Sequence, residues 1–117
     1  MDDPGARVEN FVACHLSKAV DYWNDVGLGS FKLHYVRDKE KREVDFLVLR
    51  DRKPWMLLEV KSSSLEPLSP ALTHFQNQLG APIALQVAFD AEFVEVDCSS
   101  FTSPVIVPMQ TFLSQLP

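Results

Sequence analysis

The chain has 117 residues, of which 46% are hydrophobic and 23% are charged, and its formal net charge is −5. This length and composition predict one folded domain over residues 1–117, with a hydrophobic core of its own. They exclude a transmembrane helix, because no stretch approaches the roughly 20 apolar residues of a membrane span, and the acidic balance argues against nonspecific nucleic-acid binding.

Residues 5–23 have the apolar spacing of an amphipathic helix. At roughly 100° per residue, one stripe of this helix carries Val8, Val12, Leu16, Ala19, Val20 and Trp23. Glu9 falls within the same stripe. A carboxylate on the buried side of a helix is costly unless it has a partner or a metal ion, whereas in the first turns it also complements the positive helix end. Both interpretations of Glu9 stay open.

Residues 31–36 predict the first strand, and the charged run at residues 37–42 predicts a solvated loop. A hairpin follows. Residues 44–49 and 55–60 have the length and apolar content of two strands, and residues 50–54 form a charged connection that ends in proline. On the first of these strands, Val44, Phe46 and Val48 alternate with Asp45, Leu47 and Leu49.

The register of this hairpin brings charged residues together. If Leu49 pairs with Trp55, the continuing antiparallel register places Asp45 opposite Glu59 on one face of the sheet. Lys61 lies two residues beyond Glu59 and shares that face. The sequence therefore predicts two carboxylates and one ammonium at one end of the hairpin.

Such a cluster indicates a cation site. Like charges directly opposite each other destabilise a sheet, and a divalent cation between them reverses the repulsion. Mg²⁺ favours one or two carboxylates together with retained waters and substrate phosphate oxygens. The alternative is that Asp45 and Glu59 are ordinary strand-end charges, with Lys61 as a salt-bridge partner.

A serine cluster at residues 62–64 predicts a loop beside the proposed site, and a second helix follows it. Ser69 has the residue type of an N-cap, and Pro70 suits the first helical position. Gly80 ends this helix, since glycine is the usual residue in the left-handed conformation after a helix.

The remaining elements complete the predicted sheet. Residues 82–89 form a continuous apolar strand, as expected when both faces are covered. Residues 93–96 are a further candidate strand, residues 105–107 are extended, and a terminal helix begins at Pro108. The order α-β-β-β-α-β predicts an α/β fold, with a mixed central β-sheet flanked by helices.

Cysteine usage and the N-terminus indicate the compartment. Cys14 and Cys98 are too few for a disulfide framework and have no zinc-site spacing. The N-terminus reads MDDPGARVEN and lacks the basic and apolar regions of a signal peptide. We therefore expect a cytoplasmic protein with reduced thiols.

The ordered set Glu9, Asp45 and Glu59-Val60-Lys61 resembles the PD-(D/E)XK nuclease superfamily, which has a restriction endonuclease-like core. More narrowly, four stretches resemble the DUF4143 domain: GARVENFVACHL, YVRDKEKREVDFLVL, LLEVKSSS and VIVPMQTFL. That domain follows an AAA+-like ATPase module in many bacterial and archaeal proteins. This sequence has no GxxxxGK[ST] phosphate loop and begins almost at the motif-bearing helix, so we expect a fragment of a longer ATPase.

The resemblance implies a role for each matching residue. Asp45 and Glu59 would bind Mg²⁺ or Mn²⁺, with the backbone carbonyl of Val60 as a further ligand. Lys61 would orient or activate the attacking water and steady the charge that develops on the phosphate. Glu9 would be an accessory acid at the metal site.

Two functions of different class follow from these residues. The first is a metal-dependent DNA endonuclease-like domain, whose expected substrates include branched DNA. It would be associated with an N-terminal or separate AAA+-like ATPase module. The alternative is a non-catalytic DNA-docking or protein-interaction and regulatory module on a nuclease scaffold. The first function is favoured by the presence of Glu9, Asp45, Glu59 and Lys61, although Val44 replaces the proline of the superfamily motif. The second function is favoured by the acidic net charge. The oligomeric state stays open, and a homodimer is compatible with the sequence.

Overall fold

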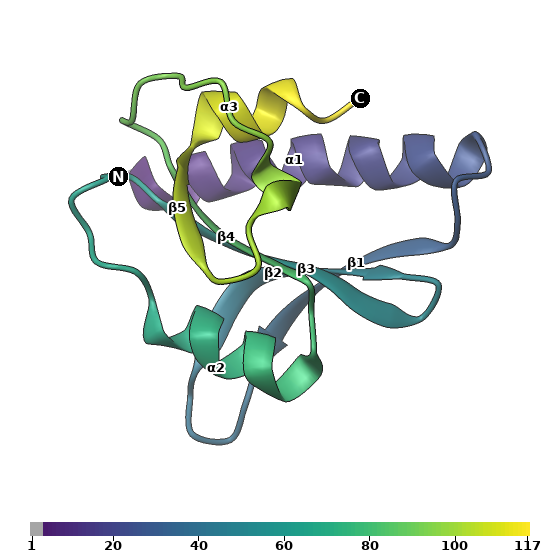
Figure 1. Ribbon diagram of the computed structural model, residues 1–117, viewed down its shortest axis with the longest axis horizontal. Helices are drawn as coiled ribbons and strands as arrows, with labels where there is room; N and C mark the ends of the chain where they lie inside the picture. The colour runs from purple at the N-terminus through teal and green to yellow at the C-terminus, as the bar shows by residue number, and fades with distance from the viewer. Residues whose placement is uncertain (1–3) are drawn as a thin grey trace.

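The apolar runs of the sequence form the strands of a mixed sheet with helices on both of its faces (Figure 1). The computed structural model describes residues 4–117. The elements follow in the order α1 (Pro4–Asp25), β1 (Phe31–Arg37), β2 (Glu43–Arg50), β3 (Lys53–Lys61), α2 (Pro70–Leu79), β4 (Ile83–Ala88), the 3₁₀ helix η1 (Cys98–Ser100), β5 (Val105–Pro108) and α3 (Met109–Ser114).

The spatial order of the five strands follows their order in the chain. Strands β1, β2 and β3 pair antiparallel, whereas β3, β4 and β5 pair parallel. A parallel pair needs a crossover connection, and α2 lies in the one between β3 and β4. Every residue of β4 is buried, as the continuous apolar run predicted. The expected element order and the mixed sheet with flanking helices are confirmed.

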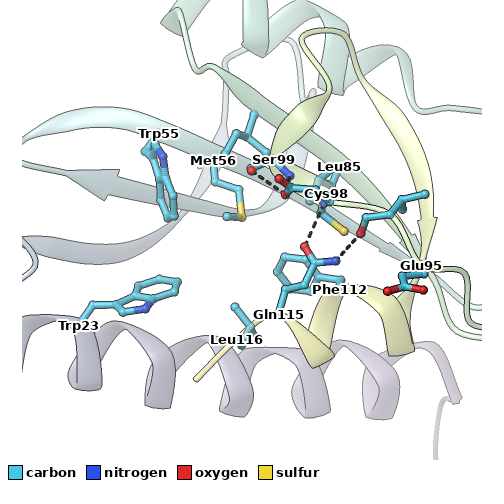
Figure 2. Close-up of a pocket in the computed structure, with 13 residues that line it drawn as sticks. Trp23, Trp55, Met56, Leu85, Glu95, Cys98, Ser99, Phe112, Gln115 and Leu116 are labelled. Carbon is cyan, nitrogen blue, oxygen red and sulfur yellow. Dashed lines mark hydrogen bonds between the residues drawn. The ribbon is translucent and has the colours of Figure 1, made fainter.

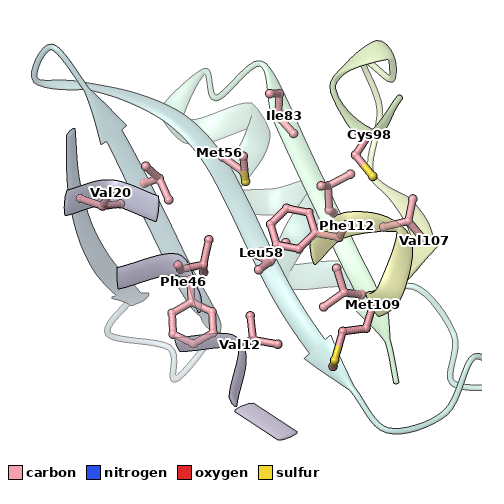
Figure 3. Packing of buried hydrophobic residues seen from close by; sticks show 14 of the residues in the cluster. Val12, Val20, Phe46, Met56, Leu58, Ile83, Cys98, Val107, Met109 and Phe112 are labelled. Carbon is pink, nitrogen blue, oxygen red and sulfur yellow. The ribbon is translucent and has the colours of Figure 1, made fainter. Parts of the chain in front are cut away.

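Two hydrophobic clusters hold the helices on the sheet. Helices α1 and α3 cover one face and α2 covers the other (Figure 1). The cluster on the α1 face is shown in Figure 3 and includes Val12, Val20, Phe46, Met56, Leu58, Ile83, Val107, Met109 and Phe112. The cluster on the α2 face includes Leu57, Leu72 and Phe75. The consecutive residues Leu57 and Leu58 are both fully buried, in different clusters, so β3 is covered on both sides.

Helix α1 has the predicted amphipathic character. Val12, Leu16 and Val20 of the apolar stripe are buried against the sheet. Glu9 is exposed, so of the two interpretations the structure does not support a carboxylate buried within the stripe. Among the helices within residues 4–117, none combines the length and hydropathy that crossing a bilayer requires.

The β2–β3 hairpin keeps the predicted register in its middle and departs from it near the turn. Phe46 pairs with Leu58 as predicted, but Leu49 pairs with Pro54 rather than with Trp55. The prediction for Leu49 is wrong because the strands close through a tight turn at residues 51–52, both with positive φ, as two-residue hairpin turns require. A bulge beside Pro54 absorbs the extra residue.

A second irregularity lies in β2 against β1. The register shift there leaves Asp45 and Phe46 opposite the single residue Tyr35, which is the pattern of a β-bulge. Alternation is broken as a result: Val44 packs with Leu47 in the α2-face cluster, whereas Phe46 packs in the α1-face cluster. The predicted common face for Val44 and Phe46 is wrong for this reason.

Helix α2 begins at Pro70 and ends at Leu79, with Gly80 as its C-cap, as predicted. Gly80 adopts the left-handed conformation, with φ of 70°. Ser69 occupies the N-cap position, but within the described structure its side chain makes no capping hydrogen bond. Instead its backbone N–H donates to Oε1 of Gln86 at 2.8 Å. The start of α2 is therefore attached to the centre of the sheet by a side chain of β4.

Residues 93–96 are coil and not the short strand that the sequence suggested. Their backbone groups bind side chains of the C-terminal segment instead of a neighbouring strand. The Val94 N–H donates to Oγ1 of Thr111 at 3.0 Å, and that hydroxyl donates to the Val94 carbonyl at 2.8 Å. Gln115 Nε2 donates to the Val96 carbonyl. Because side chains satisfy these backbone groups, the segment has no need of a strand partner.

The double-sided burial of β3 makes a direct stability prediction. Leu58→Ala should lower the free energy of unfolding by about 2–5 kcal/mol, since it leaves a cavity in the core. Leu65→Ala removes the same atoms from a side chain that is 91% exposed and should change it by less than about 0.5 kcal/mol. Urea unfolding of the two variants checks this. Equal losses would contradict the packing of β3.

Candidate functional site

The last residues of β3 and one residue of β2 form an acidic pair at the end of the hairpin. The backbone ladder of these strands runs as far as Phe46 and Leu58, and Asp45 and Glu59 come directly after it. The Val60 N–H donates to Oδ2 of Asp45 at 2.8 Å. A side chain therefore joins the strands at this point, and it holds the Asp45 carboxylate in place next to β3.

Glu59 is the unusual member of this pair. Its side chain belongs to a residue only 7% exposed, and among the described residues its Oε2 is buried with no hydrogen-bond partner. Burial is the main reason that its pKa rises from 4.5 to about 8, and the charge of Asp45 and a hydrogen bond with the Asp45 side chain raise it further. The pair therefore favours either a bound proton or a cation between the carboxylates.

Lys61 and Glu9 also act on the Glu59 carboxylate. The positive charge of Lys61, the last residue of β3, opposes the rise in the pKa of Glu59, and the negative charge of Glu9 adds to it. The exposed Glu9 side chain is thus close enough for its charge to raise the pKa of the buried Glu59 carboxylate. The structure brings all four predicted side chains into one electrostatic cluster centred on Glu59, which we call the acidic site: Glu9, Asp45, Glu59 and Lys61.

The side chains of the acidic site fit a hard divalent cation that keeps several waters. Within residues 4–117 there is no group of three or more His, Cys, Asp or Glu side chains arranged to hold a metal ion, so Asp45 and Glu59 would be the close carboxylate donors. One or two carboxylates suffice for Mg²⁺, and the orphaned Oε2 of Glu59 is a donor atom without another use. For Val60, the contact that the structure shows is through its N–H; its carbonyl as a ligand stays a prediction.

Gln86 is a polar residue of this region that the sequence interpretation missed. It is fully buried in the middle of β4 and pairs with Glu59 across the parallel strands. Besides accepting from Ser69, it donates through Nε2 to the Pro67 carbonyl at 3.1 Å. The available signal was an amide inside the apolar run PIALQVAF, since a buried polar side chain must find partners.

The loop at residues 62–69 is fixed beside the acidic site. Gln86 ties its second half to the sheet, and the Ser64 N–H donates to Oδ1 of Asp90 at 2.7 Å. At the start of the loop, the Phe89 N–H donates to the Lys61 carbonyl at 2.9 Å. These bonds give Lys61 and the following serines a defined position next to the carboxylates.

The fold and the site together define a class of protein: an α/β domain with a mixed five-stranded sheet, in which the buried Glu59 at the end of the central strand lies beside the carboxylate of Asp45. A family model described as a domain of unknown function, DUF4143, matches residues 4–105, and the chain belongs to that family. The match runs from α1 to the first residue of β5. No curated protein and no solved structure matches the chain.

The raised pKa of Glu59 predicts a pH-dependent stability in metal-free buffer. Between pH 4.5 and about 8 the folded protein binds the Glu59 proton more strongly than the unfolded chain does. The free energy of unfolding should therefore fall as the pH rises through this window, with a slope of up to about 1.4 kcal/mol per pH unit. Glu59→Gln cannot ionise and should lose this slope. Urea unfolding at several pH values in the window measures it.

A matched control for this series is Glu92→Gln, which removes an exposed carboxylate from a loop. It should keep the slope of the wild-type protein. Parallel pH profiles for wild type and Glu59→Gln would show that Glu59 is ionised in the folded protein at neutral pH.

Proposed function

We propose that this domain hydrolyses phosphodiester bonds in DNA with the help of a divalent metal ion. One observation carries the proposal: the buried Glu59 carboxylate, with an unpartnered Oε2, lies against Asp45 at the end of β3. Such a carboxylate pair is costly to keep without a positive charge. Perturbed pKa values also cluster at functional sites.

Each residue of the acidic site has a chemical task in this proposal. Asp45 and Glu59 hold the ion, and the N–H of Val60 keeps Asp45 oriented. A bound Mg²⁺ or Mn²⁺ supplies Lewis acidity and lowers the pKa of a coordinated water. Lys61 orients the attacking water and stabilises negative charge on the phosphate, and Glu9 is an accessory acid at the edge of the site.

The proposal includes a partner that binds the DNA. The net charge of −5 leaves this chain with little electrostatic attraction for a polyanion. An AAA+-like ATPase module, in the same chain or separate, would supply the missing basic surface and select the substrate, which includes branched DNA.

A second function has its own supporting observation. The Oδ2 atom of Asp45 accepts the Val60 N–H, so Asp45 already has a structural use in joining β2 to β3. A non-catalytic DNA-docking or protein-interaction module would keep this bond and hold a proton on Glu59 in place of a metal ion. The two functions differ in what a metal ion does to the protein.

The enzyme function predicts a defined pattern among variants. Mg²⁺ or Mn²⁺ at 100 times its dissociation constant should stabilise the wild-type fold by about 2.7 kcal/mol. Asp45→Asn should abolish both this stabilisation and DNA cleavage. Lys61→Ala should keep the stabilisation, because an ammonium is no ligand for a cation, but lose cleavage roughly a hundredfold or more. Melting temperatures with each metal, beside cleavage of duplex, single-stranded and branched DNA, measure both.

Glu92→Gln again serves as the control, since it removes an equal charge from an exposed position. If neither metal raises the melting temperature of the wild-type protein and no DNA is cut, the enzyme function is wrong for this domain. The same result, unchanged when an ATPase partner is added, would favour the docking module, which holds a proton on Glu59 in place of a metal ion.

A further inference from the structure

A hollow lies on the α1 face of the sheet, at the start of β3 and β4. It has a volume of about 590 Å³ and lies between the end of α1, these strands and the C-terminal segment (Figure 2). Trp55 at its wall precedes Glu59 by four residues of β3, which is roughly 13 Å along a strand. This hollow, which we call the tryptophan pocket, is therefore separate from the acidic site.

The walls of the tryptophan pocket are mainly apolar and aromatic. Its sheet side is formed by Met56, Ile83 and Leu85. Trp23 and Trp55 stand edge to face, with ring centroids 5.6 Å apart and an interplanar angle of 84°. The volume falls in the range of roughly 300–1,000 Å³ that is typical of small-molecule sites.

Hydrogen bonds hold the outer wall of the pocket away from the sheet. This wall is the segment at residues 95–99. Gln115 accepts the Cys98 N–H at 3.0 Å and donates to the Val96 carbonyl, and these bonds are drawn in Figure 2. Gln115 fixes this segment to the C-terminal helix, and Thr111 fixes the adjoining Val94. The wall therefore does not collapse onto Met56 and Leu85. The pocket is thus built into the fold.

The charged residues among the described lining of the pocket are all acidic. Glu95 and Asp97 line the pocket, and no Lys, Arg or His is among its described lining residues. Hydrogen bonds from the Ser99 hydroxyl and N–H hold the pKa of Asp97 below its usual value, so its carboxylate is charged at neutral pH. Arg50 stacks over the Trp55 ring, 5.8 Å from its centroid, and lines a different hollow.

The two tryptophans and the acidic residue Glu95 lie at different ends of the pocket (Figure 2). Figure 2 shows Trp23 and Trp55 at one end and Glu95 at the other, with Met56, Cys98 and Phe112 between them. A ligand that fills this space therefore meets aromatic rings at one end and a carboxylate at the other. Aromatic faces attract cations as well as apolar groups.

We propose that the tryptophan pocket binds a small amphipathic cation, a ligand with an apolar body and one ammonium group. The apolar body lies along Met56, Leu85 and the tryptophan rings, and the ammonium group lies near Glu95 and Asp97. This inference is independent of the acidic site and goes beyond the proposed nuclease function.

The two tryptophans of the chain both line the pocket, so intrinsic fluorescence reports its occupancy directly. The probes are octylammonium, 1-octanol and octanoate, which share one apolar chain, absorb no light near 280 nm and are used below micelle formation. Octylammonium should shift the tryptophan emission saturably and bind roughly three- to tenfold more tightly than octanol. Octanoate should bind most weakly.

A double neutralisation tests the charge assignment. The variant combines Glu95→Gln with Asp97→Asn, where asparagine keeps the ability to cap η1. It should bind octanol as the wild-type protein does and lose the preference for octylammonium. The control combines Glu92→Gln with Asp21→Asn, which makes the same change in net charge at exposed positions and should keep the preference.

A pair of arginine substitutions tests the location. Leu116→Arg places a positive charge in the lining, whereas Leu65→Arg places it on a side chain that is 91% exposed. Only the first should weaken octylammonium binding. Equal affinity of the wild-type protein for octylammonium and octanol, or a non-saturating emission change that Leu116→Arg leaves intact, would overturn the proposal.

Discussion

Burial of β3 on both faces is the constraint on which the rest of the structure depends. Leu57 packs under α2 and Leu58 under α1, and both are fully buried. The next residue of the strand is Glu59, whose side chain shares the face of Leu57 by alternation and is also buried. Loss of hydration is the largest cause of its raised pKa. A charged group at this position needs a proton or a cation, and this requirement is what makes the end of β3 chemically distinctive.

The same strand links two regions of different chemistry. At the end of β3, Asp45 and Lys61 set the charge around Glu59, and Gln86 anchors the loop that follows. At its beginning, Trp55 and Met56 form a wall of an apolar pocket with an acidic end. The rigid sheet between them keeps the acidic site and the tryptophan pocket apart. A ligand in the pocket and a metal ion at the carboxylates would both stabilise β3, because both bind the folded strand.

Much of the fold follows from local patterns that the sequence carries on its own. The apolar stripe of α1, the proline and glycine that bound α2, and the continuous run of β4 each specify an element within a few residues. The middle of the hairpin register also follows from alternation, which pairs Phe46 with Leu58. The likeness to DUF4143 is borne by short stretches along the chain, and the family match over residues 4–105 confirms it. These features depend on neighbours in the chain, so the sequence by itself determined them.

Other features depend on residues that are distant in the chain, and only the tertiary structure decided them. The bulge at Asp45 and Phe46 arises where β2 must fit β1, and it breaks the alternation that predicted a common face for Val44 and Phe46. Residues 93–96 have strand-like composition but are coil, because Thr111 and Gln115 satisfy their backbone groups. The spacing in the sequence predicted that Asp45 lies near Glu59. It could not predict how the helices pack over the sheet, and this packing decides the exposure of Glu9, the burial of Glu59 and the role of Gln86. Burial, and with it the pKa of Glu59, is a property of that packing, since periodicity specifies which way a side chain points but not how much of the protein covers it.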